Sequence, residues 1–153
     1  MRSAGGRMQM GQVRERSGPA FECAVPACSR SLAQLRGRFT DWLSARGVAG
    51  PARRDLVLTL SELAAAALDD ESAADRRLRV DACSDDAGVV IEVRDDRGAV
   101  DTPTRVPDLG ERGAGLAVVA TLAEVLAVRE CEGGRTMRAR LRWEDLASQP
   151  VSR

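Results

Sequence analysis

The chain has 153 residues, which is enough for one domain with an apolar core of its own. Its 23 basic and 23 acidic side chains cancel, so no overall field favours nucleic acid or an acidic membrane surface. The sequence contains no histidine, lysine or asparagine. Their absence excludes a phosphoaccepting histidine, a histidine-based catalytic triad, a P-loop lysine and an asparagine metal ligand. Its four cysteines form no Cys-x-x-Cys pair, so no zinc site is predicted.

Both ends of the chain are predicted to lie outside the folded domain. Residues 1–20 are rich in Gly, Ser, Arg and Gln and predict a disordered N-terminal arm, while residues 145–153 predict a flexible tail. One domain is therefore expected over residues 21–144. No stretch resembles a signal peptide or a membrane-spanning helix, so we expect a cytoplasmic protein without a membrane contact.

The first half of the domain predicts one strand and two helices. Residues 21–25 predict a short strand. Ser29 is a suitable N-cap for a helix whose apolar residues recur every three or four positions, and Gly47 ends it. A second helix is predicted from Pro51 to about Leu68, and its apolar face is the most continuous one in the chain.

The second half predicts two hairpins separated by a loop and a helix. Apolar and charged residues alternate in its strands, which is typical of a sheet with one exposed face. Cys83 and Cys131 fall in strand segments, where cysteine usually acts as a small core residue. The predicted segments are strands at 78–82 and 89–93, a loop at 95–113, a helix buried on nearly all sides at 114–126, and strands at 128–131 and 135–143.

The order of these elements predicts the fold class. Strands pair in hairpins and helices follow one another, which favours an α+β fold. We expect a two-layer α/β sandwich with a mixed, mainly antiparallel sheet covered on one face by three helices. The other face carries the alternating charges and should be exposed. A basic stripe there, Arg138, Arg140 and Arg142, has no interleaved aromatic residues for base stacking, so direct nucleic-acid binding is not expected.

Three segments carry polar groups that could form a site. Glu62 interrupts the apolar second helix, and either a paired functional carboxylate or a solvated edge position would explain it. Asp95 ends a strand before a glycine-containing loop, where an ordinary acidic turn is the alternative. Residues 110–116 form a glycine-rich turn before a helix, with Arg112 beside it. Such a turn can hold phosphate on backbone N–H groups, although a plain helix start has the same pattern.

Together, in this order, the segments resemble the ATP site of the GHKL family, which includes histidine kinases and type II topoisomerases. The closest resemblance is to the small stand-alone anti-sigma-factor kinases of actinomycetes, and it covers about residues 21–143. The matching motifs are Ser61-Glu62-Leu63 for the N-box helix, Ile91 to Asp95 for the strand end, Gly113-Ala114-Gly115-Leu116 for the phosphate turn, and Gly133-Gly134-Arg135-Thr136 for the last hairpin.

The resemblance implies a Bergerat-type fold and a set of site residues. Glu62 would be the catalytic carboxylate that orients or activates the nucleophile. Asp95 would accept a hydrogen bond from the adenine amino group, and Thr136 would support that contact. The phosphate turn and the helix after it would hold the phosphates. The residues implied to bind the cofactor, ATP, are Asp95, Gly98, Arg112, Gly113, Gly115, Leu116 and Thr136.

The departures from the family pattern concern magnesium and the base pocket. Ala66 stands where the family has the asparagine that binds Mg²⁺, so no metal ligand is assigned. Arg97 and Ala99 replace two family glycines, with Gly98 between them. The resemblance implies an ATP-binding regulator that controls transcription by binding a sigma factor or a STAS-type anti-anti-sigma partner, with serine kinase activity and homodimer formation as further features of such proteins. The alternative is a degenerate protein-interaction module that does not turn over ATP.

Overall fold

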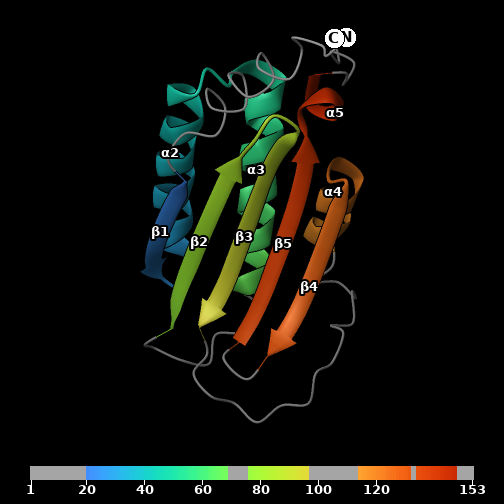
Figure 1. Cartoon of the computed structure of the whole chain (residues 1–153). Coiled ribbons are helices and arrows are strands. Elements are labelled where there is room, and N and C mark those ends of the chain that lie inside the picture. The colour runs from blue at the N-terminus through green and yellow to red at the C-terminus, as the bar shows by residue number, and fades with distance from the viewer. Residues whose placement is uncertain (1–19, 69–75, 97–113, 132–133, 148–153) are drawn as a thin grey trace, which may run out of the picture.

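A computed structural model describes residues 20–68, 76–96, 114–131 and 134–147. The described residues form one antiparallel sheet with the strand order β1-β2-β3-β5-β4. For the described residues, Figure 1 shows the helices on one face of this sheet and no helix on the other. The elements are β1 (Phe21–Pro26), α2 (Ser29–Ala45), α3 (Gly50–Ala67), β2 (Arg77–Ser84), β3 (Gly88–Asp96), α4 (Ala114–Leu122), β4 (Val125–Cys131), β5 (Gly134–Arg142) and α5 (Trp143–Ala147).

The predicted two-layer α+β sandwich is confirmed, with two differences. Every strand pairing among the described residues is antiparallel, so this part of the sheet is not mixed. Helix α5 joins α2, α3 and α4 on the covered face (Figure 1). It places Leu146 in the core, where a loose tail beginning at residue 145 was expected.

The core lies between the sheet and the helices, where the sequence periodicity predicts it. Alternate residues of each strand point inward, and α2 and α3 contribute one apolar face each. Phe39 stacks on Trp42 and meets the edge of Phe21, which fixes α2 against β1. The fully buried side chains include Leu35, Leu43, Leu56, Leu60, Leu63, Leu78, Val80, Ile91, Met137 and Leu141.

Helix α4 is shorter and less buried than the sequence predicts. It ends at Leu122, and Val125 already begins β4, because an apolar run alone does not distinguish a helix from a strand. The backbone N–H of Glu124 donates to the carbonyl of Arg140, so the chain joins the sheet at once. The prediction that α4 is buried on nearly all sides is also wrong, since Val118 is 41% exposed.

Three smaller predictions are corrected by the structure. Ser29 is the first residue of α2 and Cys28 holds the N-cap position, without a side-chain cap. Trp143 begins α5 and does not continue β5. Cys83 is exposed, because Ala82 and Ser84 take the inward positions of β2, and Cys23 on β1 is the buried cysteine. The side chain of Cys131 lies outside the described residues.

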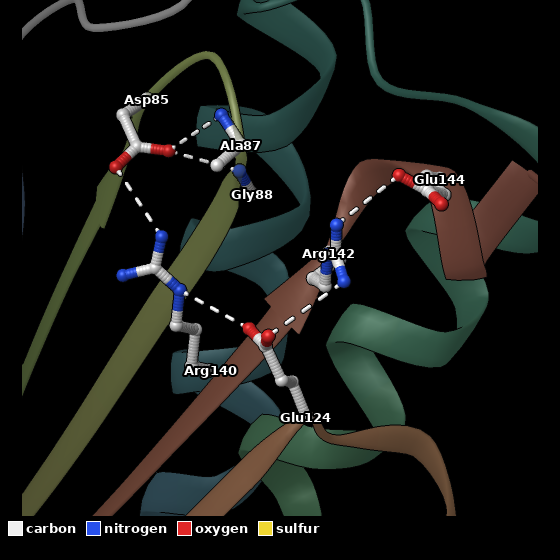
Figure 2. A network of polar contacts seen from close by, with 7 residues as sticks. All are labelled: Asp85, Ala87, Gly88, Glu124, Arg140, Arg142 and Glu144. Atoms are coloured by element: carbon white, nitrogen blue, oxygen red, sulfur yellow. Dashed lines mark hydrogen bonds and ion pairs between the residues drawn. The ribbon is translucent and has the colours of Figure 1, made fainter.

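The end of the sheet at the β2–β3 turn carries a network of exposed charges. Figure 2 shows Asp85 accepting hydrogen bonds from the backbone N–H groups of Ala87 and Gly88, at 2.8 and 2.9 Å. Arg140 then lies between Asp85 and Glu124, 3.9 and 3.4 Å from their carboxylates. This network links the turn, the start of β4 and strand β5.

Within the described ranges, no helix combines the length and the apolar character needed to cross a bilayer.

Candidate functional site

Helix α3 presents Glu62 to the beginning of α4. The inward face of α3 is formed by apolar residues such as Leu60 and Leu63, and Glu62 lies beside that face, toward α4. A Cβ atom added to Gly115 would collide with Glu62 Oε2 and would lie 3.1 Å from its Cδ. The Glu62 carboxylate therefore rests against the backbone of the first turn of α4. The positive end of a helix dipole favours a negative charge at this place.

Gly115 and Leu116 make this approach close, in different ways. Gly115 has no side chain to separate α4 from Glu62, so the glycine is required for the contact. Leu116 is buried in the core and so anchors the start of α4 there. Leu116 therefore contributes packing, while Gly115 contributes the space that Glu62 occupies.

Ala66 lies one turn beyond Glu62 on the same side of α3. Its methyl group has no lone pair, so this position does not fit a magnesium ligand. The described residues contain no cluster of three cysteine, aspartate or glutamate side chains that could hold a metal in its place. The donor set on α3 thus retains the carboxylate of the motif and lacks its amide.

Asp95 is buried at the end of β3 and is paired with Arg76. The side chain of Asp95 has no exposed surface, and that of Arg76 is 5% exposed. Arg76 Nε donates to Asp95 Oδ1 at 3.0 Å, and Arg76 Nη2 donates to Asp95 Oδ2. Arg76 Nη2 also donates to the carbonyl oxygen of Ala67 at 3.1 Å, at the C-terminus of α3. One guanidinium therefore joins the end of α3, the start of β2 and the end of β3.

Strand register places Arg135, and not Thr136, beside Asp95. Asp95 is directly opposite Arg135, and Val93 is opposite Met137, so these residues share the inward face of the sheet. Thr136 is opposite Arg94 on the outer face, so the structure does not bring it to Asp95. The sequence carried a signal for this, because Met137 fixes the phase of β5 and places Arg135 on the same side.

The described residues hold only part of the predicted site. Gly98, Arg112 and Gly113 lie outside them, as do Arg97 and Ala99. Within the described part, the structure brings Glu62 to Gly115 and brings Asp95 to the end of α3. Glu62 and Ala67 are five residues apart, which corresponds to about 7.5 Å along the helix axis. Helix α3 therefore contributes to both parts of the site, at two positions less than two turns apart.

A cavity of about 310 Å³ lies at the other end of the sheet. Arg46 is part of it, and its guanidinium is 4.1 Å from the centre of the Trp42 ring and donates to Ser84 Oγ at 3.2 Å. Burial lowers the pKa of Arg46 from its ordinary value. The cavity is separate from the motif residues and is lined by Arg46, Gly47, Val48, Ala49, Ala52, Ser84 and Trp143.

Comparison with known proteins identifies the family. The sequence pattern of the histidine kinase-like ATPase domain matches residues 25–143. The chain belongs to the histidine kinase-like ATPase family. The resemblance to the GHKL family, built on four short motifs, is thereby confirmed. A family of ATPase domains implies a nucleotide site.

One solved structure extends the comparison to the fold. The crystal structure of the RsbU and RsbW domains of Rv1364c from Mycobacterium tuberculosis is similar, with a TM-score of 0.61 and 22% sequence identity. The match covers 81% of this chain and 32% of that one, so the chain spans about a third of the larger protein. At this identity the likeness establishes the fold alone. A search of curated proteins finds no match.

Proposed function

We propose that this protein is an ATP-binding regulator of the anti-sigma-factor type, which acts by binding a sigma factor or a STAS-type anti-anti-sigma protein. The observation that carries the proposal is the position of Glu62, whose carboxylate lies against Gly115 at the start of α4. The phosphate turn of the motif leads into this helix. Membership of the histidine kinase-like ATPase family and the fold shared with an RsbW-containing structure support the same proposal.

The serine kinase activity of this protein is proposed to be low. Glu62 is available to orient or activate an attacking hydroxyl group. Phosphoryl transfer also needs neutralisation of the developing charge on the phosphates, and Mg²⁺ supplies it in kinases. Because Ala66 provides no metal ligand, we propose that this chain binds ATP but transfers its phosphoryl group inefficiently. Binding to the protein partner is then its main activity.

A second candidate is a protein-interaction module that no longer binds ATP. The observation in its favour is the pair between Arg76 and Asp95, which engages both oxygens of the carboxylate assigned to adenine. Under this alternative the fold would present its surface to a sigma factor or a STAS-type protein without any nucleotide. The two candidates differ in a single measurable property, which is ATP binding by the full chain.

Calorimetric titration with ATP, in Mg²⁺ and then in EDTA, separates the candidates. We expect micromolar binding by the full chain that changes little between the two conditions, because Ala66 offers no metal ligand. The variant Ala66→Asn should add a dependence on Mg²⁺. Ala65→Asn is the matched control, since it puts the same amide on the exposed neighbouring position of α3. Absence of ATP binding in every protein would leave the protein-interaction module.

The partner class is tested separately from the nucleotide. Purified sigma factors and STAS-type proteins from the source organism would be titrated one by one against the full chain, with and without ATP. We expect one saturable complex of defined stoichiometry. Sedimentation of the chain alone tests whether it forms a homodimer. No complex with either class of protein would contradict the proposed regulatory role, whatever the result with ATP.

A further inference from the structure

The face of the sheet that no described helix covers carries its charges in rows (Figure 1). Strand register places Glu22 opposite Asp81 and Asp81 opposite Glu92, which makes an acidic row across β1, β2 and β3. The next outward positions on β2 and β3 hold Arg79 and Arg94, which are opposite each other and make a basic row. The acidic row and the basic row therefore lie side by side on the same face of the sheet.

These rows are unfavourable within one chain, because like charges directly opposite each other on neighbouring strands repel. On β3 the two rows are joined, since Arg94 Nη2 lies 2.8 Å from Glu92 Oε1. On β2 they are not joined. Arg79 is exposed and Asp81 is partly exposed, and neither side chain makes a hydrogen bond or ion pair with another residue in the described part of the chain. Strand β2 thus presents an unpaired cation and an unpaired anion to the outside.

A face with this order of rows is complementary to a second copy of itself. A two-fold axis can lie in the plane of contact, perpendicular to the strands and between the two rows. Rotation about this axis places the acidic row of one copy against the basic row of the other. Arg79 then faces Asp81 of the second copy, and Asp81 faces Arg79 of the second copy. Each such contact occurs twice, as in any interface with two-fold symmetry.

The shape and size of the face also fit a second copy. A hollow of about 340 Å³ lies where the rows would meet, and it gives room for an arginine side chain of the other copy. Five strands at about 4.8 Å spacing, with up to nine residues at about 3.4 Å each, give a face of roughly 700 Å². A standard interface buries about 800 Å² per partner. The hollow is lined by Glu22, Cys23, Ala24, Arg79 and Asp81.

We propose that the protein forms a two-fold symmetric dimer through this face of the sheet, in which Arg79 of each copy pairs with Asp81 of the other. The alternation of rows favours a second copy over a polyanion such as nucleic acid, because the acidic row repels phosphates. This inference goes beyond the proposed function and does not depend on nucleotide binding.

Sedimentation equilibrium of the full chain and of two charge-reversal variants tests the interface. We expect the unaltered chain to be a dimer. Arg79→Asp places a carboxylate against Asp81 of the other copy, and Asp81→Arg places two guanidinium groups together. Each change should weaken the dimer more than about tenfold, since like charges then meet across the interface. Arg36→Asp, an equal charge change at an exposed position of α2, is the matched control and should leave the dimer unchanged.

A mixture of the two single variants tests the pairing itself. When Arg79→Asp meets Asp81→Arg, opposite charges face each other at both contacts, so an equimolar mixture should form a heterodimer. Its dissociation constant should be within about threefold of that of the unaltered dimer. The double variant Arg79→Asp with Asp81→Arg should also dimerise, because the exchange of charges keeps the complementarity.

The outcomes that would overturn the inference are distinct. An unaltered chain that is monomeric at about 100 µM would overturn it, because a dimer of useful affinity forms well below this concentration. Folded single variants, checked by circular dichroism, that dimerise as the unaltered chain does would place any dimer interface elsewhere. A mixture that stays monomeric would refute the pairing of Arg79 with Asp81. If a single variant does not fold, dimerisation of the double variant decides. Absence of ATP binding would contradict the proposed function and leave this inference intact.

Discussion

The two ends of the sheet use the same pairing of arginine with carboxylate in opposite environments. At one end Arg76 and Asp95 are buried together, and at the other Arg140 and Asp85 are 40% and 52% exposed. The buried pair makes two directed hydrogen bonds, whereas the exposed pair is 3.9 Å apart. The distance between two charges therefore does not by itself determine how much the pair contributes to the free energy of unfolding. Burial and hydrogen-bond geometry are also needed.

Burial decides how much each pair contributes when one partner is removed. A buried charge without its partner loses both water and its counter-ion, so breaking such a pair is strongly unfavourable. An exposed charge returns to water at little cost, and dissolved salt screens its interaction further. The end of the sheet with the motif residues should therefore be sensitive to charge changes, and the end with the exposed network should be tolerant.

The largest effect is expected for Arg76→Gln. This change removes a buried cation and both of its hydrogen bonds to the Asp95 carboxylate, and it removes the donor to Ala67 O. We expect a loss of about 3–5 kcal/mol in the free energy of unfolding, measured by urea denaturation at neutral pH. Arg77→Gln, at the exposed first position of β2, should cost less than about 0.5 kcal/mol. Equal losses for the two variants would refute the larger contribution of the buried pair to the free energy of unfolding.

At the exposed end of the sheet, Gly88 should not tolerate a larger side chain, because it lies against the backbone of β5. A Cβ atom on Gly88 would collide with the carbonyl oxygen of Leu141 and would lie 3.0 Å from the Cα of Arg142. Gly88→Ala should therefore lower the free energy of unfolding by about 1–3 kcal/mol, as overpacking does. Gly37→Ala in α2 is the control, since nothing lies within 4 Å of its added Cβ. That variant should be stabilised by about 0.5–1 kcal/mol, and urea denaturation of both variants measures the two changes.

The strands were predictable from the sequence, whereas the boundary of α4 and the partners of Asp95 were not. Alternation of apolar and charged residues predicted the inward faces of β2, β3 and β5, because one face of each strand meets the helices. Arg76 carried no such signal. It falls next to Arg77 in a polar stretch, and its burial depends on the end of α3, nine residues earlier. Only the folded chain brings these groups together.

The candidate site was predicted unevenly for the same reason. Glu62 and Gly115 belong to motifs with a fixed spacing, and the structure brings them into contact. Thr136 was assigned from its motif alone, and strand register places Arg135 opposite Asp95. The period of two in β5 contains this information, since residues 135, 137 and 139 share one face. Motif spacing predicted that Glu62 and Gly115 belong together, whereas the neighbour of Asp95 on β5 follows from strand phase.

A third carboxylate, that of Asp55, provides a comparison with the buried pair. Asp55 Oδ2 in α3 is buried and has no hydrogen-bond partner among the described residues. Desolvation raises the pKa of Asp55 above its ordinary value of 3.8, and the nearby charge of Arg54 opposes this in part. The folded protein therefore holds this proton to a higher pH than the unfolded chain does.

The stability contributed at Asp55 should fall as the pH rises. Between the unfolded pKa of about 3.8 and the raised folded pKa, the folded state binds more protons, so increasing pH favours unfolding. Asp55→Asn removes this loss, and we expect its unfolding midpoint to exceed that of the unaltered chain at pH 7. The difference should shrink below pH 4. A difference that is independent of pH would refute the role of ionisation.

The smallest effect is expected for Arg140→Gln in the exposed network of Figure 2. Arg140 contacts Glu124 at 3.4 Å and Asp85 at 3.9 Å, and all three side chains are well exposed. Removing the charge should change the free energy of unfolding by about 0.2–0.5 kcal/mol in low salt. In 1 M salt the difference should vanish, because the screening length is then only about 3 Å. The loss at Arg76 should persist in the same salt, since water and ions do not reach that pair. If Arg140→Gln still lowered the free energy of unfolding in 1 M salt, exposure would not explain the different contributions of the two charge pairs.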